Sequence, residues 1–153
     1  MLAAEDRHFR SHLGVDVIAM VRAAASNVWH RRIISGASTI TMQLARNLYR
    51  EVGRERSVVR KAKEILTAIR IERTYTKREI LESYLNTVPF LYNAHGVEMA
   101  ARTYFGTHAP DLTVTQAATL VAMLKGPSEY NPVRHPEAAL RRRNLVLRLM
   151  EQQ

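Results

Sequence analysis

The densest group of side chains that can do chemistry lies at the start of the chain. Glu5, Asp6, His8, His12 and Asp16 fall within twelve residues. A carboxylate beside histidine and arginine can serve as a general base when its surroundings tune its pKa. Metal binding is less favoured, because no third ligand stands at a zinc-like spacing from the two histidines. A structural role stays open: Asp6 or Asp16 would then cap a helix, and His12 would be packed and hydrogen-bonded.

A second polar cluster, Gly36–Asn47, places a glycine and several hydroxyl groups ahead of a short apolar pattern. Backbone N–H groups at a helix start suit a phosphate, and Arg46 adds positive charge. The alternative is that Ser38 or Thr39 is a helix cap, which is the common role of such residues. Both interpretations predict a short helix that begins near Thr39 and ends at about Leu48.

Charged residues dominate a third segment, in which Arg60 and Glu64 stand four residues apart. Spacing alone favours an ion pair on the helix surface. The functional interpretation is an acid held among cations beside an anionic group. In a fourth segment, Lys77–Asn86, the apolar residues have the spacing of a core face, and Asn86 is typical of a helix end.

Helices are predicted to position all of these residues, because apolar periodicity is helical and strand signals are weak. Capping boxes at Thr76–Glu79 and Thr113–Gln116 mark two helix starts, and Gly106 marks a helix end. The predicted helices span residues 15–30, 39–48, 58–69, 76–87, 94–104, 117–124 and 136–150.

Three of these helices carry an apolar stripe that predicts a buried face. The stripes are Val17, Ile18, Val21, Ala24, Ala25 and Val28 in the first; Val58, Val59, Ala62, Ile65, Leu66 and Ile69 in the third; and Leu140, Leu145, Val146, Leu149 and Met150 in the last. The run Arg141–Arg143 in the last helix is predicted to be a solvated face.

The composition predicts one compact domain. The chain has 153 residues, of which 46% are hydrophobic and 24% charged, which argues against disorder and against a coiled coil. A net charge of +9 favours nucleic acid, an anionic membrane surface or a phosphorylated substrate, with a generally basic surface as the alternative. The absence of cysteine excludes a thiol nucleophile and a disulfide framework. No stretch approaches the roughly 18 to 20 apolar residues that span a bilayer, and no signal peptide is visible.

Taken in order, the four segments resemble the glycosyltransferase domain of class A penicillin-binding proteins and monofunctional peptidoglycan transglycosylases. The family patterns are E-D-x-x-F-x-x-H-x-G-x-D, G-x-S-T-I-T-x-Q-L-x-K-N, R-K-x-x-E and K-x-E-I-L-x-x-Y-L-N. Further matches extend the resemblance over nearly the whole chain, at Ala100, Ala101, Tyr104–Gly106, Lys125–Pro127, Tyr130–Pro132 and Ala139–Leu147.

This resemblance implies an all-α, lysozyme-like fold with two helical lobes around a cleft. It also implies the polymerisation of lipid II on a glycan carried by undecaprenyl pyrophosphate, which is released. Glu5 matches the general base, and Glu64 matches a second acid near the donor pyrophosphate. Arg46 stands where the family usually has lysine, which keeps the charge but changes hydrogen-bond geometry. The matched substrate positions are Asp6, Phe9, His12, Ser38, Thr39, Gln43, Arg46, Asn47, Arg56, Arg60 and Lys63.

The same resemblance sets expectations for partners and location. We expect no tightly bound cofactor, although a divalent cation, Mg²⁺ or Mn²⁺, fits the substrate pyrophosphate. The expected partners are lipid II, polyprenyl-linked glycan, an anionic membrane surface and other cell-wall synthesis proteins, but not nucleic acid. The expected location is the outer face of a bacterial cytoplasmic membrane. Because the family's membrane helix and transpeptidase domain lie outside these 153 residues, we expect a chain truncated at its N-terminus.

Three alternatives remain at this stage. A lysozyme-like glycan hydrolase would also use two acids, but uncharged glycan needs no cationic clamp around Arg46, Arg56, Arg60 and Lys63. A basic helical domain that binds nucleic acid is permitted by the charge but lacks a recognised motif. The chain could also be an inactive, truncated fragment.

Overall fold

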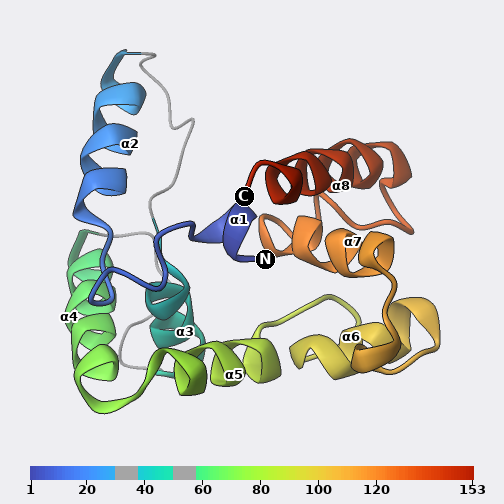
Figure 1. The fold of residues 1–153 in the computed structure, drawn as a ribbon, viewed down its shortest axis with the longest axis horizontal. Coiled ribbons are helices and arrows are strands. Elements are labelled where there is room, and N and C mark those ends of the chain that lie inside the picture. The colour runs from blue at the N-terminus through green and yellow to red at the C-terminus, as the bar shows by residue number, and fades with distance from the viewer. Residues whose placement is uncertain (30–37, 50–57) are drawn as a thin grey trace. The chain divides into compact units, whose positions relative to one another are not determined.

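The computed structural model describes residues 1–29, 38–49 and 58–153, and these ranges are predominantly helical (Figure 1). Within them the β pairing consists of one isolated bridge between Pro89 and His95. The predicted all-α class is therefore confirmed. The elements are α1 (Leu2–Glu5), α2 (Val17–Trp29), α3 (Ile40–Leu48), α4 (Val58–Thr74), α5 (Lys77–Thr87), α6 (Gly96–Phe105), the 3-10 helix η2 (Ala109–Asp111), α7 (Val114–Leu124) and α8 (Pro136–Glu151).

The chain divides into two compact units, each described here by itself. Unit 1 comprises Met1–Arg7 and Glu82–Gln153, and unit 2 comprises His8–Leu81. Each predicted helix is present, whereas α1 and η2 were not predicted because elements of 4 and 3 residues are too short to show a helical period. Across the described ranges, no helix combines the length and the apolar composition that a bilayer crossing requires.

Unit 2 is organised by the packing of α3 against α4. The buried residues of α4 are Glu64, Ala68 and Ile71. The predicted stripe on this helix is wrong in part, since Val58, Val59 and Leu66 are 87%, 67% and 58% exposed. The physical reason is that a fully buried carboxylate occupies a position on the face toward α3, where periodicity analysis expects only apolar side chains.

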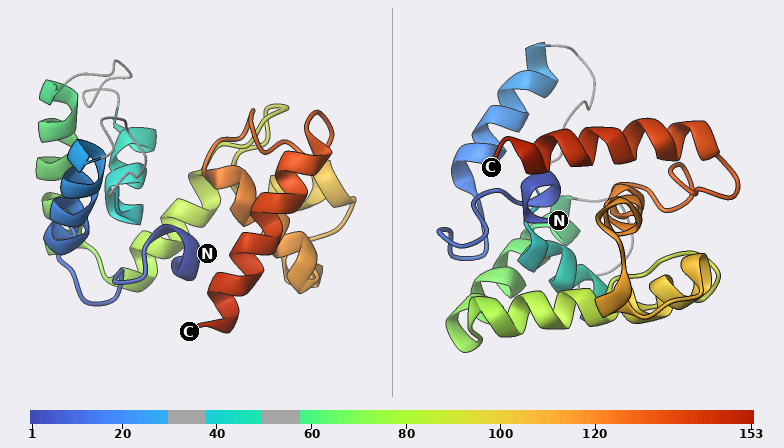
Figure 2. Two further views of the ribbon diagram at one scale, coloured as in Figure 1. Left: turned by 90° about the horizontal axis from the view of Figure 1, so that it is seen from above. Right: turned by 45° about the vertical axis from the view of Figure 1, so that its right-hand side comes forward.

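The predicted buried stripe of α2 is contradicted as well. Val17, Ile18 and Val21 are 65%, 68% and 65% exposed, and the side chain of Val28 lies outside the described part. In Figure 1 and in the right-hand view of Figure 2, α2 extends beyond the ends of α3 and α4. No described helix packs on α2 in the way that α3 packs on α4. Helix α2 is therefore amphipathic in sequence, but no described helix covers its apolar face.

Unit 1 is organised by α7 and α8, which pack around Ala118, Ala122 and Val146. Ala4 of α1 is partly buried against the same core, which fixes α1 onto this helix pair. The stripe predicted for α8 is only partly correct: Val146 is buried, but Leu140, Leu145 and Met150 are 46%, 36% and 41% exposed. The reason is that α8 faces its neighbours through small residues such as the buried Ala139. Alanine is only weakly hydrophobic, so it does not mark the buried face clearly in the sequence.

The predicted capping residues are confirmed, although α4 continues to Thr74, beyond the predicted end at residue 69, and α7 begins at Val114 rather than at residue 117. The Thr76 N–H and hydroxyl donate to the Glu79 carboxylate at 2.8 and 2.7 Å, and Thr113 and Gln116 form the second capping box. Thr39 caps α3 by accepting from the Met42 N–H at 3.2 Å. Gly106 ends α6 in the left-handed conformation, with φ of 63°.

Gly14 is predicted to be sensitive to substitution by alanine. Its φ is +89°, and an added Cβ would lie 2.8 Å from the Ala68 carbonyl oxygen. Backbone strain and the clash together are expected to lower the unfolding free energy of Gly14→Ala by about 2–5 kcal/mol. Gly106→Ala is the matched control, because its φ is also positive but its Cβ meets no atom within 4 Å. It should lose about 1 kcal/mol. Urea denaturation followed by circular dichroism measures both, and equal losses would refute the proposed clash.

Candidate active site

Glu64 is the centre of a buried ionic cluster in unit 2. Its side chain is completely buried, yet it is bonded to Arg60 and lies 3.1 Å from the Lys61 ammonium. The Arg46 guanidinium, from α3, approaches the same carboxylate at 3.8 Å. The prediction of an Arg60–Glu64 pair is confirmed, but its placement on the helix surface is wrong. Counted over the described residues, the cluster has three cations for one carboxylate and so an excess of positive charge.

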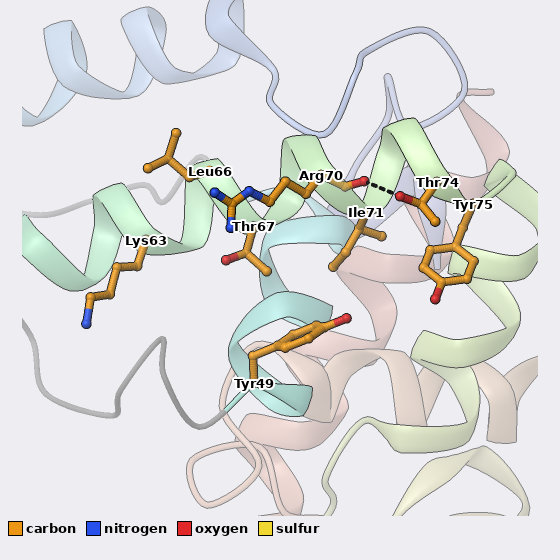
Figure 3. Close-up of a pocket in the computed structure, with 8 residues that line it drawn as sticks. All are labelled: Tyr49, Lys63, Leu66, Thr67, Arg70, Ile71, Thr74 and Tyr75. Carbon is orange, nitrogen blue, oxygen red and sulfur yellow. Dashed lines mark hydrogen bonds between the residues drawn. The ribbon is translucent and has the colours of Figure 1, made fainter.

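Lys61 connects this cluster to the segment that leads into α3. Its ammonium donates to the Ser38 hydroxyl at 2.8 Å as well as contacting Glu64. The family resemblance implies Lys63, rather than Lys61, as a substrate-binding residue. In the structure Lys63 lines a pocket that is formed by other residues of α4 together with Tyr49 and Tyr75 (Figure 3). The i, i+3 spacing between Lys61 and Glu64 is the signal in the sequence for this contact.

The other residues predicted around α3 have mixed environments. The Thr39 hydroxyl donates to the Gly14 carbonyl at 2.6 Å in addition to capping the helix, which accounts for it structurally. Gln43 is half-buried, and the Asn47 side chain is exposed. Arg56 lies outside the described residues. Of this predicted group, the structure thus brings Ser38 and Arg46 to the Glu64 cluster.

Phe9 and His12 belong to a packed network rather than to the Glu64 cluster. Phe9 is 2% exposed, the His12 ring packs edge-on against it with centroids 6.1 Å apart, and the Lys77 ammonium lies 4.5 Å from its centroid. Lys77 also donates to the His12 carbonyl at 2.7 Å and to Glu72 at 2.8 Å. Glu72 also accepts from the Thr41 hydroxyl at 2.5 Å, and the sequence did not indicate this contact because Thr41 lies 31 residues before Glu72.

The predicted capping role of Asp16 is present in the structure. Its carboxylate accepts from the Ala19 N–H at 2.8 Å and contacts the His8 ring at 2.7 Å. The Ala19 N–H and the His8 ring hold the pKa of Asp16 below its usual range. These contacts account for Asp16 and His8 without a catalytic role.

Glu5 lies in unit 1, at the end of α1. Its side chain is 9% exposed, and its carboxylate lies 3.8 Å from the Arg142 guanidinium of α8. Arg142 is itself 16% exposed and lies over the Tyr130 ring at 6.0 Å. The prediction that Arg141–Arg143 is a solvated face is therefore wrong for Arg142, which turns toward Glu5. Asp6 is buried beside it, at 7% exposure.

The described chain is thus an all-helical domain with a nearly buried acid in each unit, one of them held among cations. The family model described as "Transglycosylase" matches residues 1–151, and the chain belongs to the transglycosylase family. The match confirms the resemblance inferred from the motifs.

Individual relatives agree with this assignment. The chain is 52% identical over 149 residues to "Penicillin-binding protein 1A" of Aquifex aeolicus (strain VF5), which covers 97% of this chain and 20% of the relative. It is 42% identical over 154 residues to "Penicillin-binding protein 1B" of Haemophilus influenzae, covering 98% and 20%. It is 45% identical over 147 residues to "Penicillin-binding protein 4" of Bacillus subtilis (strain 168), covering 96% and 23%. The chain therefore spans about a fifth of the length of these relatives.

Proposed function

We propose that the chain is a peptidoglycan glycosyltransferase that polymerises lipid II into glycan strands. The observation that carries this proposal is the cluster in which Arg46, Arg60 and Lys61 surround the buried Glu64. A departing diphosphate needs a fixed cationic environment, because negative charge develops on it as the bond breaks. The match to the transglycosylase family over residues 1–151 supports the same reaction class.

In the proposed reaction, Glu5 is the general base. The 4-hydroxyl of the acceptor sugar of lipid II gives its proton to the Glu5 carboxylate, and its oxygen forms a bond to the anomeric carbon of the donor glycan. The bond between that carbon and the pyrophosphate oxygen breaks, and undecaprenyl pyrophosphate leaves with the electron pair. The near burial of the Glu5 carboxylate and its contact with the Arg142 guanidinium at 3.8 Å support this role, since both limit the positions that the carboxylate can take.

The donor pyrophosphate is proposed to bind near the Glu64 cluster, with Ser38, Arg46, Arg60 and Lys61 as contacts. Glu64 would hold the cations in place rather than contact the phosphates, because its carboxylate already accepts from Arg60 and Lys61. A resident metal ion does not fit among these three cations. Within the described ranges, no group of three His, Cys, Asp or Glu residues could hold a metal. Any Mg²⁺ or Mn²⁺ is therefore proposed to arrive with the pyrophosphate.

A glycan hydrolase is the alternative that paired acids would also allow. The excess positive charge around Glu64 favours the transferase, because a polymeric glycan substrate offers no diphosphate to bind. Incubating the protein with lipid II separates the two activities. The transferase yields polymeric glycan and free undecaprenyl pyrophosphate, whereas release of fragments from preformed glycan, with lipid II left intact, would refute the proposal.

The uncovered face of α2 is proposed to bind the outer surface of the cytoplasmic membrane, where lipid II and any cell-wall synthesis partners are located. Leu13, Val17, Ile18 and Val21 form an exposed apolar group, and Leu13 is 77% exposed. Such a group can enter the headgroup region while the chain's charge of +9 attracts anionic lipids.

A Val17→Ser/Ile18→Ser protein is therefore expected to bind anionic vesicles roughly ten-fold or more weakly, because two large apolar side chains no longer enter the bilayer. Vesicle co-sedimentation measures the effect. Val133→Ser is the matched control, since Val133 is 71% exposed and lies outside this group. Equal weakening in both proteins would show that α2 is not the membrane contact.

A further inference from the structure

A second candidate binding site lies in unit 2, beside α4 and away from Glu64. It is a pocket of about 420 Å³, which falls within the range of roughly 300–1,000 Å³ that is typical of small-molecule sites. None of the residues that contact Glu64 lines it. The lining residues are Tyr49, Lys63, Leu66, Thr67, Arg70, Ile71, Thr74 and Tyr75.

The cations of the pocket lie on one face of α4. Lys63 and Arg70 are seven residues apart, close to two helical turns and about 10 Å along the axis. Thr67 lies between them on the same face, four residues after Lys63 and three before Arg70. The long side chains of both cations can therefore converge on an anion at the level of the Thr67 hydroxyl. The described lining carries two cationic side chains and no acidic residue.

The remaining walls are apolar or aromatic. Figure 3 shows the Tyr49 ring across the pocket from Thr67 and Ile71, with Tyr75 at one end and Lys63 at the other. Ile71 is 5% exposed and provides a fixed apolar surface. This combination suits a ligand that joins an anionic group to an apolar or ring-shaped portion, since rings stack on tyrosine and the anion stays with the cations.

We propose that this pocket binds a phosphate ester. Lys63, Thr67 and Arg70 hold the phosphate, because an ammonium, a hydroxyl and a planar guanidinium together satisfy several phosphate oxygens. Tyr49 and Leu66 contact the rest of the molecule. The chemistry is shared by a phospholipid headgroup and by a soluble phosphate ester. The site is distinct from the proposed donor site, so it can be tested whether or not lipid II is polymerised.

Titration of the whole chain with inorganic phosphate, followed by the amide signals of Thr67 and Arg70 in NMR spectra, tests the site directly. These two signals are expected to shift with a dissociation constant in the millimolar range, and Arg70→Met should weaken binding about ten-fold. Arg73→Met is the matched control, because Arg73 is exposed on the same helix but does not line the pocket. Thr67→Val, expected to weaken binding a few-fold, replaces Arg70→Met if that protein fails to fold.

Vesicles distinguish the two sources of phosphate. Weaker co-sedimentation of Arg70→Met than of Arg73→Met with phosphatidylglycerol vesicles, but not with phosphatidylcholine vesicles, would identify a lipid headgroup. Unchanged co-sedimentation together with the NMR shifts at Thr67 and Arg70 would identify a soluble phosphate. The proposal is overturned if phosphate shifts only the signals of Ser38 and Lys61, or if Arg70→Met and Arg73→Met bind phosphate equally.

Discussion

A Glu5→Gln protein is expected to polymerise lipid II about 10²- to 10⁴-fold more slowly than the wild-type chain. Glutamine keeps the size and hydrogen-bonding ability of the side chain but cannot accept the proton of the acceptor hydroxyl. Because a base acts in the transition state, the loss should appear in kcat with little change in KM. Initial rates of glycan formation from lipid II measure both constants.

The fold should tolerate this change, so the loss of rate can be assigned to chemistry. Helix α1 is fixed to the α7–α8 pair through Ala4, and glutamine has nearly the same size and shape as the Glu5 side chain that lies 3.8 Å from Arg142. Glu137→Gln is the matched control, because Glu137 lies on α8 with a side chain that is 87% exposed. It should keep the wild-type rate. A Glu5→Gln protein that polymerises lipid II as fast as this control would exclude Glu5 as the base.

Local signals in the sequence predicted the helices and their ends well. Capping boxes such as Thr113–Gln116 and the left-handed end at Gly106 depend on residues three or four positions apart. Both partners of each contact therefore lie within one short segment of the sequence. Apolar stripes were a weaker guide to burial. They predicted a covered face on α2, but coverage depends on whether another helix arrives there, and none of the described helices does.

The candidate site shows the same division between local and distant contacts. The Arg60–Glu64 contact was predicted because its residues are one turn apart, whereas its burial required α3 to pack on α4. Lys61, which contacts Glu64, and the predicted substrate residue Lys63 are only two positions apart on α4. Two residues correspond to about 200° around the helix, which separates the Glu64 cluster from the pocket wall.

The Glu64 cluster leads to the second large expected effect. Glu64→Gln is expected to lower the free energy of unfolding by about 3 kcal/mol, because removing one partner of a buried ion pair leaves the other charges uncompensated. The estimate is at the low end for buried pairs, since Arg46 and Lys61 are 39% and 34% exposed and water screens them. Urea denaturation of both proteins measures the difference.

A double-mutant cycle with Arg60 separates repulsion from lost packing. Arg60→Met removes the cation that bonds Glu64, so Glu64→Gln/Arg60→Met should lose less stability than the sum of the two single changes. Strict additivity would show that the Arg60–Glu64 contact contributes nothing to stability.

Inorganic pyrophosphate then tests whether the cations around Glu64 form an anion site. Glu64→Gln removes the carboxylate that the three cations share, so pyrophosphate should bind the variant more tightly and raise its Tm more than that of the wild-type chain. Polymerisation should nevertheless fall, because Glu64 no longer orients the cations toward the leaving group. Lys125→Met, which changes an exposed lysine outside the cluster, controls for general charge effects. A folded Glu64→Gln protein with the wild-type rate and an unchanged response to pyrophosphate would show that this cluster is structural and that the diphosphate binds elsewhere.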